Sequence, residues 1–153
     1  MTSCKHEHEH KSPAQLVAAA RQICDAQGRR FTKLREHVFT LVANSPGPVK
    51  AYDLLEQLRP EFGSPKPPTV YRALEFLAGL GLVHRVEALN AYIACDENHR
   101  HNGSQFMICE TCGHAEEVHL CHIPEGLQKQ ADQQNFNVAH WNVELHGQCK
   151  DCG

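Results

Sequence analysis

The sequence CETC at residues 109–112 is matched by CKDC at residues 149–152, close to the end of this 153-residue chain. Two residues between the thiols of a pair let one tight turn present both sulfurs to a single tetrahedral ion. Two such pairs make a closed site of four sulfurs, which predicts a structural rather than a catalytic zinc on Cys109, Cys112, Cys149 and Cys152. A single pair would also fit a redox dithiol, but that setting requires a βαβ pattern, which the flanking sequence lacks.

The residues around and between the two pairs predict a small α+β unit. We expect a strand on each side of the first pair, then a helix and another strand, over residues 105–109, 115–120, 125–134 and 138–145. These elements explain why 36 residues separate the pairs, which is more than in a simple zinc ribbon. In so small a unit, the metal is expected to supply much of the folding free energy.

The composition of the whole chain favours metal ligands over disulfides. The chain has 8 cysteines and 12 histidines. No apolar run reaches membrane-spanning length, and the polar N-terminus lacks the apolar core of a secretory signal, which predicts a cytoplasmic protein with no membrane partner. In that reducing compartment, cysteines are more often metal ligands than disulfide partners, and histidine is the commonest metal ligand.

Upstream of the cysteine pairs, apolar residues recur at helical spacing. This periodicity predicts helices over residues 13–27, 32–44, 51–58 and 69–80. Thr32 is expected to cap the second helix, and Pro60 to close the third. The buried stripe of the fourth helix is predicted to consist of Val70, Leu74, Leu77 and Ala78.

The pattern then changes to one typical of strands. Residues 82–86 and 91–95 flank a short turn that contains Asn90, which predicts a β-hairpin. Helices followed by a hairpin describe a winged helix-turn-helix, in which one helix enters the major groove of DNA. The alternative is a small helical domain without a nucleic-acid partner.

The fold class is therefore α+β, with an N-terminal winged helix-turn-helix domain and a small C-terminal α/β domain with a Cys4 zinc site. The expected segments are a flexible His-rich tail, the winged-helix domain, a hinge or loop and the zinc-stabilised domain, at residues 1–12, 13–95, 96–104 and 105–153. Residues 1–85 carry 12 Lys and Arg against 8 Asp and Glu, a balance of +4, whereas residues 86–153 carry 3 against 10, a balance of −7. Only the first part has a charge that suits phosphates.

Further metal ligands cluster in the sequence where the two predicted domains join. His84 and Cys95 belong to the expected hairpin, His99 and His101 to the polar loop, and Glu117 follows the first cysteine pair. Thiolate, imidazole and carboxylate together favour zinc, although iron also accepts such ligands. A site assembled from both domains would exist in one arrangement only, so metal binding could act as a switch.

Three stretches carry a resemblance to a known family. They are AYDLL at 51–55, PPTVYRAL at 67–74 and HGQC at 146–149. They resemble the ferric uptake regulator superfamily, and in particular its zinc uptake regulator branch, over nearly the whole chain. The resemblance implies a homodimer that, when loaded with zinc, binds an AT-rich inverted repeat in double-stranded DNA and represses zinc-uptake genes. The C-terminal domain is then the dimerisation domain.

The resemblance also implies particular residues and two or more zinc ions per subunit. It implies a structural zinc on the four paired cysteines and a regulatory zinc on His84, Cys95, His101 and Glu117. Alternative or additional metal ligands are His99, Glu116, His119, His122 and His140. The DNA-binding residues that match the family, or lie on or beside the expected recognition helix, are Tyr52, Lys66, Thr69, Tyr71 and Arg72.

Other functions remain as alternatives. The same fold could sense iron or peroxide, and the metal preference of the junction site would distinguish these signals. A zinc hydrolase needs an open metal position and a base, and no HExxH-type motif is present, so we predict that the protein is not an enzyme. A zinc-binding interaction module would differ from a repressor in binding no DNA.

Overall fold

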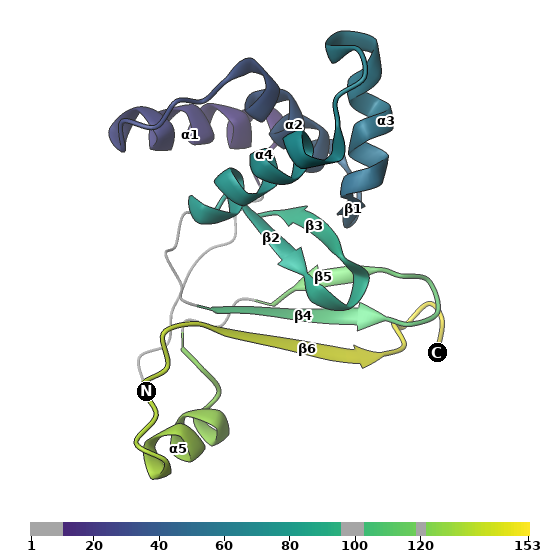
Figure 1. Ribbon diagram of the computed structural model, residues 1–153. Coiled ribbons are helices and arrows are strands. Elements are labelled where there is room, and N and C mark those ends of the chain that lie inside the picture. Colours follow the sequence, from purple (N-terminus) through teal and green to yellow (C-terminus); the bar gives the residue numbers. More distant parts are fainter. Residues whose placement is uncertain (1–10, 96–102, 119–121) are drawn as a thin grey trace. The chain divides into compact units, whose positions relative to one another are not determined.

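The computed structural model describes residues 11–95, 103–118 and 122–153 (Figure 1). These residues form two compact units, one within residues 8–98 and one within residues 99–153. We call them the helical unit and the sheet unit. Among the described residues, no helix is both long enough and apolar enough to cross a membrane.

The helical unit begins with two helices whose first turns are capped by side chains. Helix α1 (Pro13–Ala26) starts with a capping box, in which the Ser12 hydroxyl accepts from the Gln15 backbone N–H and the Gln15 side chain accepts from the Ser12 N–H. Helix α2 (Lys33–Asn44) follows the expected cap, since the Thr32 hydroxyl accepts from the Arg35 N–H.

Helix α3 (Ala51–Phe62) continues past Pro60, so the prediction that this proline closes the helix is wrong. Proline lacks the N–H that would donate within the helix, but the next turn still closes, because Gly63 donates from its N–H to the carbonyl of Arg59 at 3.0 Å. Burial of Leu58 and packing of Phe62 on the core hold this last turn in place. The helix ends at Gly63, whose φ of 74° suits glycine.

Helix α4 (Pro67–Gly79) starts two residues earlier than predicted, because Pro67 and Pro68 occupy its first turn, where a missing N–H costs nothing. Its buried side is wider than the predicted stripe. It comprises Val70, Ala73, Leu74, Phe76 and Leu77, whereas Ala78 is exposed. The expectation that Ala78 is buried is therefore wrong, because the core lies against the side of the helix that carries Phe76.

A small antiparallel sheet completes the helical unit. It consists of β1 (Val49–Lys50), β3 (Ala91–Ala94) and β2 (Val83–Val86), in that order. The hairpin between β2 and β3 confirms the prediction and turns through a short 3₁₀ helix (Glu87–Leu89). The four helices and this sheet bury one core, which includes the fully buried side chains of Val38, Phe39, Leu54, Leu58, Leu74 and Leu77.

The sheet unit has the predicted strand, strand, helix, strand order. Its elements are β4 (Gly103–Cys109), β5 (Ala115–Glu117), α5 (Glu125–Gln133) and β6 (Trp141–Gly147). The strand order is β5-β4-β6, with β4 antiparallel to β5 and parallel to β6. Pairing of Gly103 with Trp141 explains why β4 starts inside the expected 96–104 loop and why β6 starts after Val138. A side chain at residue 103 would collide with the Trp141 ring.

Candidate metal centres and nucleic-acid interface

Parallel pairing of β4 with β6 places the two cysteine pairs next to each other. Cys109, the last residue of β4, pairs with Gly147, the last residue of β6. The N–H of Glu110 then donates to the Gly147 carbonyl at 2.9 Å and holds the two strand ends together. Residues far apart in the sequence therefore leave the sheet at the same point.

A tight turn after each strand directs the sulfurs inward. In the first turn, the Cys109 N–H donates to the His114 carbonyl at 2.8 Å, and Gly113 adopts a φ of 73°. In the second, the N–H groups of Cys152 and Gly153 both donate to the Cys149 carbonyl at 3.0 Å. Local backbone hydrogen bonds thus define the turn that holds each Cys-x-x-Cys pair.

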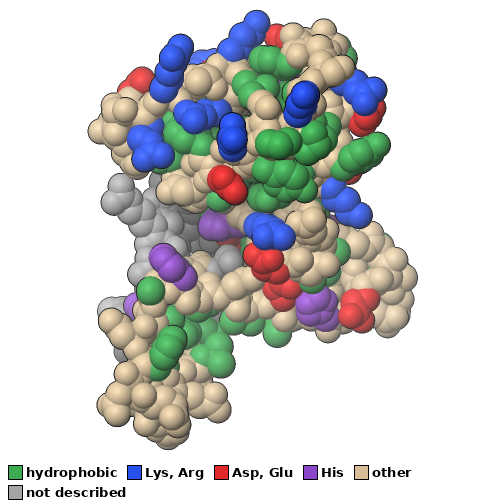
Figure 2. All heavy atoms as spheres, viewed as in Figure 1, with side chains coloured by type: hydrophobic (Ala, Val, Ile, Leu, Met, Phe, Trp, Pro, Cys, Tyr) green, Lys and Arg blue, Asp and Glu red, His purple; other side chains and the backbone are tan. Residues whose placement is uncertain are grey.

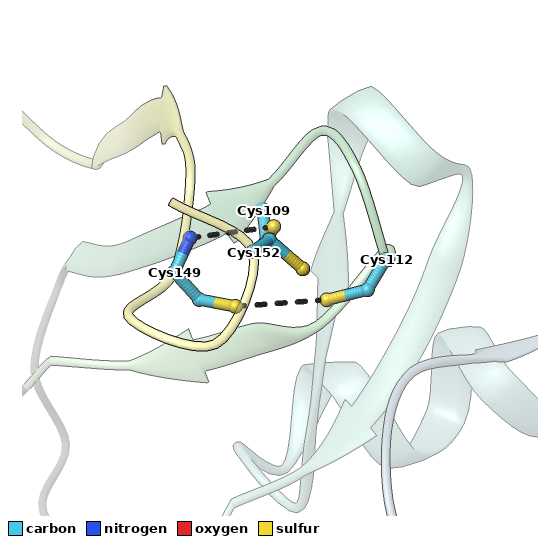
Figure 3. A group of neighbouring side chains, drawn as sticks. All are labelled: Cys109, Cys112, Cys149 and Cys152. Carbon is cyan, nitrogen blue, oxygen red and sulfur yellow. Dashed lines mark hydrogen bonds between the residues drawn. The ribbon is translucent and has the colours of Figure 1, made fainter.

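The four sulfurs converge on one point (Figure 3). All four lie within 4.8 Å of one another, and those of Cys112 and Cys149 are 3.9 Å apart. With zinc–sulfur bonds of about 2.3 Å, a tetrahedral site has sulfur–sulfur edges of about 3.8 Å, so the cluster fits zinc. All the ligand positions are thiols, and none is left for a substrate.

Three thiols of this cluster have pKa values that differ from that of a free cysteine. The backbone N–H of Cys149 donates to the Cys109 sulfur at 3.4 Å, and this hydrogen bond is the main reason why the pKa of Cys109 falls to about 6. Hydrogen bonds with the thiols of Cys149 and Cys112 raise the pKa of Cys152 to about 12. For Cys112, the N–H of His114 lowers the pKa, but the hydrogen bond with Cys109 and burial outweigh it and the net shift is upward.

Two predicted regulatory ligands come together within the helical unit. His84 lies on β2, and Cys95 directly follows β3 with its N–H donating to the Leu82 carbonyl at 2.9 Å. The Cys95 sulfur and an imidazole nitrogen of His84 lie within 4.8 Å of each other. Cys95 is buried and His84 is half-buried, so both are shielded from competing water.

The two predicted carboxylates lie on opposite faces of the sheet unit. Glu117 pairs with the buried Phe106 on β4 and is half-buried, whereas its neighbour Glu116 pairs with Met107 and is exposed. Successive side chains of a strand point to opposite faces, so Glu116 and Glu117 cannot substitute for each other without a shift of register.

Of the remaining histidine candidates, only His122 and His140 lie among the residues that the structure describes. His99, His101 and His119 lie outside the described residues, so their expected roles stay predictions. His122 and His140 are both exposed, the second just before β6.

The residues predicted to bind DNA are all exposed on the helical unit. Tyr52, at the start of α3, is 70% exposed, and Tyr71 on α4 is 40% exposed. Lys66 precedes α4, and Thr69 and Arg72 lie on its exposed side. Figure 2 shows Lys and Arg side chains gathered over the helical unit, in agreement with the positive balance of this part of the sequence.

Comparison with known proteins identifies the family. Residues 26–146, which include helices α2 to α5 and the first cysteine pair, match the model of the ferric uptake regulator family. The chain belongs to this family.

Relatives within the ferric uptake regulator family extend the similarity to nearly the full length. The zinc uptake regulation protein of Escherichia coli K12 is 36% identical over 94% of this chain and 85% of its own length. A zinc uptake regulator solved in complex with zinc and DNA is 36% identical, with a TM-score of 0.85 over 92% of this chain and 95% of that one. A holo zinc uptake regulator structure is 37% identical, with a TM-score of 0.78 over 90% of this chain and 96% of that one.

These similarities confirm the predicted family, its zinc uptake regulator branch and the mixed α and β fold. Sequence reasoning missed one side-chain contact of helix α4, in which the guanidinium of Arg35 from α2 stacks on the ring of Phe76. An aromatic residue on a helix and an arginine far from it in the sequence carry no shared pattern that could have revealed this contact.

Proposed function

We propose that this protein is a zinc-responsive transcriptional repressor that binds operator DNA as a zinc-loaded homodimer and represses zinc-uptake genes. The observation that carries the proposal is the similarity to the zinc uptake regulator solved with zinc and DNA. The protein acts in the cytoplasm and is not an enzyme. Its operator is an inverted repeat, since the symmetry of a dimer calls for two half-sites, and the family resemblance implies that this repeat is AT-rich.

The four-cysteine cluster holds a structural zinc in this proposal. Its geometry supports this role, because four sulfurs close the coordination sphere and leave no position for catalysis. Zinc would join the end of the chain to the end of β4 and so stabilise the sheet unit.

Zinc affinity at this site should depend steeply on pH. Near pH 7.5, Cys109 is already a thiolate, whereas Cys112 and Cys152 must release their protons when zinc binds. The apparent association constant should therefore rise with pH by at least about two powers of ten per unit near pH 7.5, and more steeply below pH 6, where Cys109 is also protonated. Competition with a zinc chelator in a Cys95→Ser background measures this site alone, and a pH-independent constant would contradict the assignment.

A second zinc, on His84, Cys95, His101 and Glu117, is the regulatory ion. The proximity of His84 to Cys95 supports two of its ligands. The half-buried Glu117 is a better ligand than the exposed Glu116, because partial burial strengthens the attraction between carboxylate and ion. The protein thus binds two or more zinc ions per subunit, with His99, His119, His122 and His140 as further or alternative ligands.

The segments then have distinct roles. Residues 13–95 bind DNA, the sheet unit from β4 onward forms the dimer, the segment between β3 and β4 is the hinge, and the start of the chain is a His-rich tail. Exposed apolar side chains of the sheet unit support dimerisation there: Met107, Leu127, Phe136 and Leu145 are each at least 43% exposed.

The exposed side of α4 and the residues beside it contact DNA in this proposal. Arg72 and Lys66 bind phosphates or guanine edges, and Tyr52 and Tyr71 bind phosphates or thymine methyl groups. Thr69 lies in the first turn of α4, between Lys66 and Tyr71 in the sequence. Exposure of all five side chains on one unit supports this arrangement.

Replacement of Arg72 by alanine should weaken operator binding without altering zinc content or dimer formation. The guanidinium is exposed, so its loss removes contacts to DNA and leaves the core intact. We expect a loss of about 1–3 kcal/mol of binding free energy in fluorescence anisotropy. Arg59→Ala, which removes another exposed arginine of the helical unit, is the control. An Arg72→Ala protein with unchanged operator affinity would remove Arg72 from the interface.

The proposed function is tested by anisotropy of an AT-rich palindromic duplex at fixed salt, with buffered zinc and then ferrous iron. Tight binding with zinc only, and little competition by scrambled duplex, would support it. A response to iron would favour a different signal on the same fold, as would a response to peroxide, for which a peroxide-responsive repressor of Staphylococcus saprophyticus, 27% identical, is a relative. Failure to bind any of several palindromes with either metal would refute it.

A further inference from the structure

Two arginines lie on one aromatic ring of helix α4. The guanidinium carbon of Arg35, in the first turn of α2, is 3.7 Å from the ring centroid of Phe76, and that of Arg29 is 5.4 Å away. Arginine stacks well on aromatic faces because its charge is planar and weakly hydrated. The stack covers Phe76, which is only 9% exposed. It therefore joins the start of α2 to the second half of α4.

The same arginine also holds the loop between α1 and α2. A guanidinium nitrogen of Arg35 donates to the Arg30 carbonyl at 2.6 Å. Its backbone N–H donates to the Thr32 hydroxyl at 3.3 Å. Loop residues 29–32 are thus tied to Arg35, and through Arg35 to Phe76.

The position of Phe76 relates this loop to the DNA-reading side of α4. Arg72 lies four residues before Phe76, so the two side chains are neighbours on the surface of the helix. Arg72, Arg35 and Arg29 therefore lie around a single turn of α4. None of the three forms an ion pair with a carboxylate in the part of the chain that the structure describes. Such a group of unpaired cations suits the phosphates of a nucleic-acid backbone.

We propose that Arg35 is a positioning residue for operator binding. Its stack on Phe76 and its bond to the Arg30 carbonyl set the distance between the cationic loop at residues 29–32 and Arg72. This loop and helix α4 then form one surface that binds successive phosphates of the DNA backbone. This inference rests on the proposed function, because it concerns the same DNA-binding surface.

The proposal separates the shape of Arg35 from its charge. Arg35→Lys keeps the charge but loses the planar stack and its geometry. Phe76→Leu keeps an apolar side chain but loses the ring, whereas Phe76→Tyr keeps the ring. The matched control is Arg21→Lys, because Arg21 also joins α1 to α2, through Glu36, and is not one of the two arginines on the Phe76 ring.

The experiment measures zinc-saturated operator affinity as a function of salt, with thermal unfolding of each variant alongside. We expect Arg35→Lys and Phe76→Leu each to lower operator affinity about tenfold. The slope of the logarithm of the affinity against the logarithm of the salt concentration should also become shallower, by about one for each phosphate that is no longer neutralised. The double variant Arg35→Lys/Phe76→Leu should bind no more weakly than either single variant. Phe76→Tyr, which keeps the ring, should bind the operator as the wild type does. Arg21→Lys should alter unfolding without altering affinity or salt slope.

Several results would overturn the proposal. Normal affinity in Arg35→Lys would show that shape is irrelevant, and normal affinity in Phe76→Leu would show that Arg35 does not act through the ring. Additive effects in the double variant would indicate independent roles. In all these cases the wild type still binds the operator with zinc, so the proposed function would stand. A wild type that binds no duplex would overturn both.

Hydrogen exchange of backbone amides tests the link between the loop and the ring without DNA. Amides at residues 29–32 should exchange faster in Arg35→Lys and in Phe76→Leu than in wild type, and at the wild-type rate in Phe76→Tyr. Unchanged exchange in the first two variants would show that the loop is not tied through the ring.

Discussion

Cys112→Ser is expected to leave the sheet unit unfolded and to remove one tightly bound zinc per chain. A structural zinc on four thiolates contributes on the order of 10–16 kcal/mol of apparent binding free energy at neutral pH, and in small domains that free energy drives folding. The sheet unit has little core of its own beyond Phe106, Ile108 and Ala115, and α5 has no buried residue. A serine hydroxyl cannot replace a thiolate as a zinc ligand, so most of this free energy should be lost.

Three measurements check this outcome. Metal analysis should show one zinc fewer, circular dichroism should show a weaker strand signal, and sedimentation should show monomers. Cys24→Ala is the matched control, because Cys24 is fully buried in α1 and belongs to the helical unit, so its loss should leave zinc content unchanged. A stable dimer of Cys112→Ser that lacks only the zinc would contradict the structural role.

Cys95→Ser is expected to abolish the response to zinc while the protein stays folded. Cys95 directly follows β3 beside His84, and it is not one of the residues that form the core cluster of the helical unit. Allosteric coupling between an effector and a ligand is typically about 5–150-fold in affinity, so we expect operator affinity to lose a zinc dependence of that size. The ion can shift the equilibrium only by binding the two arrangements differently, and removal of the thiolate removes that difference.

Anisotropy titrations with and without zinc measure this loss, and metal analysis checks that the cysteine cluster keeps its ion. His84→Ala should behave in the same way, because it removes the neighbouring ligand, whereas Cys24→Ala should respond as wild type. A Cys95→Ser protein that still binds the operator only with zinc would exclude Cys95 from the sensor.

Local signals in the sequence predicted most of the elements. Thr32 precedes the second helix and caps it as predicted. The hairpin around Asn90 follows from the change from helical to alternating periodicity. Two local signals failed, and in both cases packing on the core was decisive. Phe62 packs on the core and extends α3 past Pro60, and Phe76 takes the buried place on α4 that the periodicity gave to Ala78.

The sequence by itself determined the two Cys-x-x-Cys pairs, the order of the helices and of the strands other than β1, and the family. Each of these depends on residues close together in the chain, whose spacing carries the physical signal. Only the tertiary structure decided that β4 and β6 run parallel and so bring the cysteine pairs together, that Glu117 rather than Glu116 pairs with the buried Phe106, and that Arg35 covers Phe76. These contacts join residues that are distant in sequence or depend on strand register, and no local periodicity encodes which partners they choose.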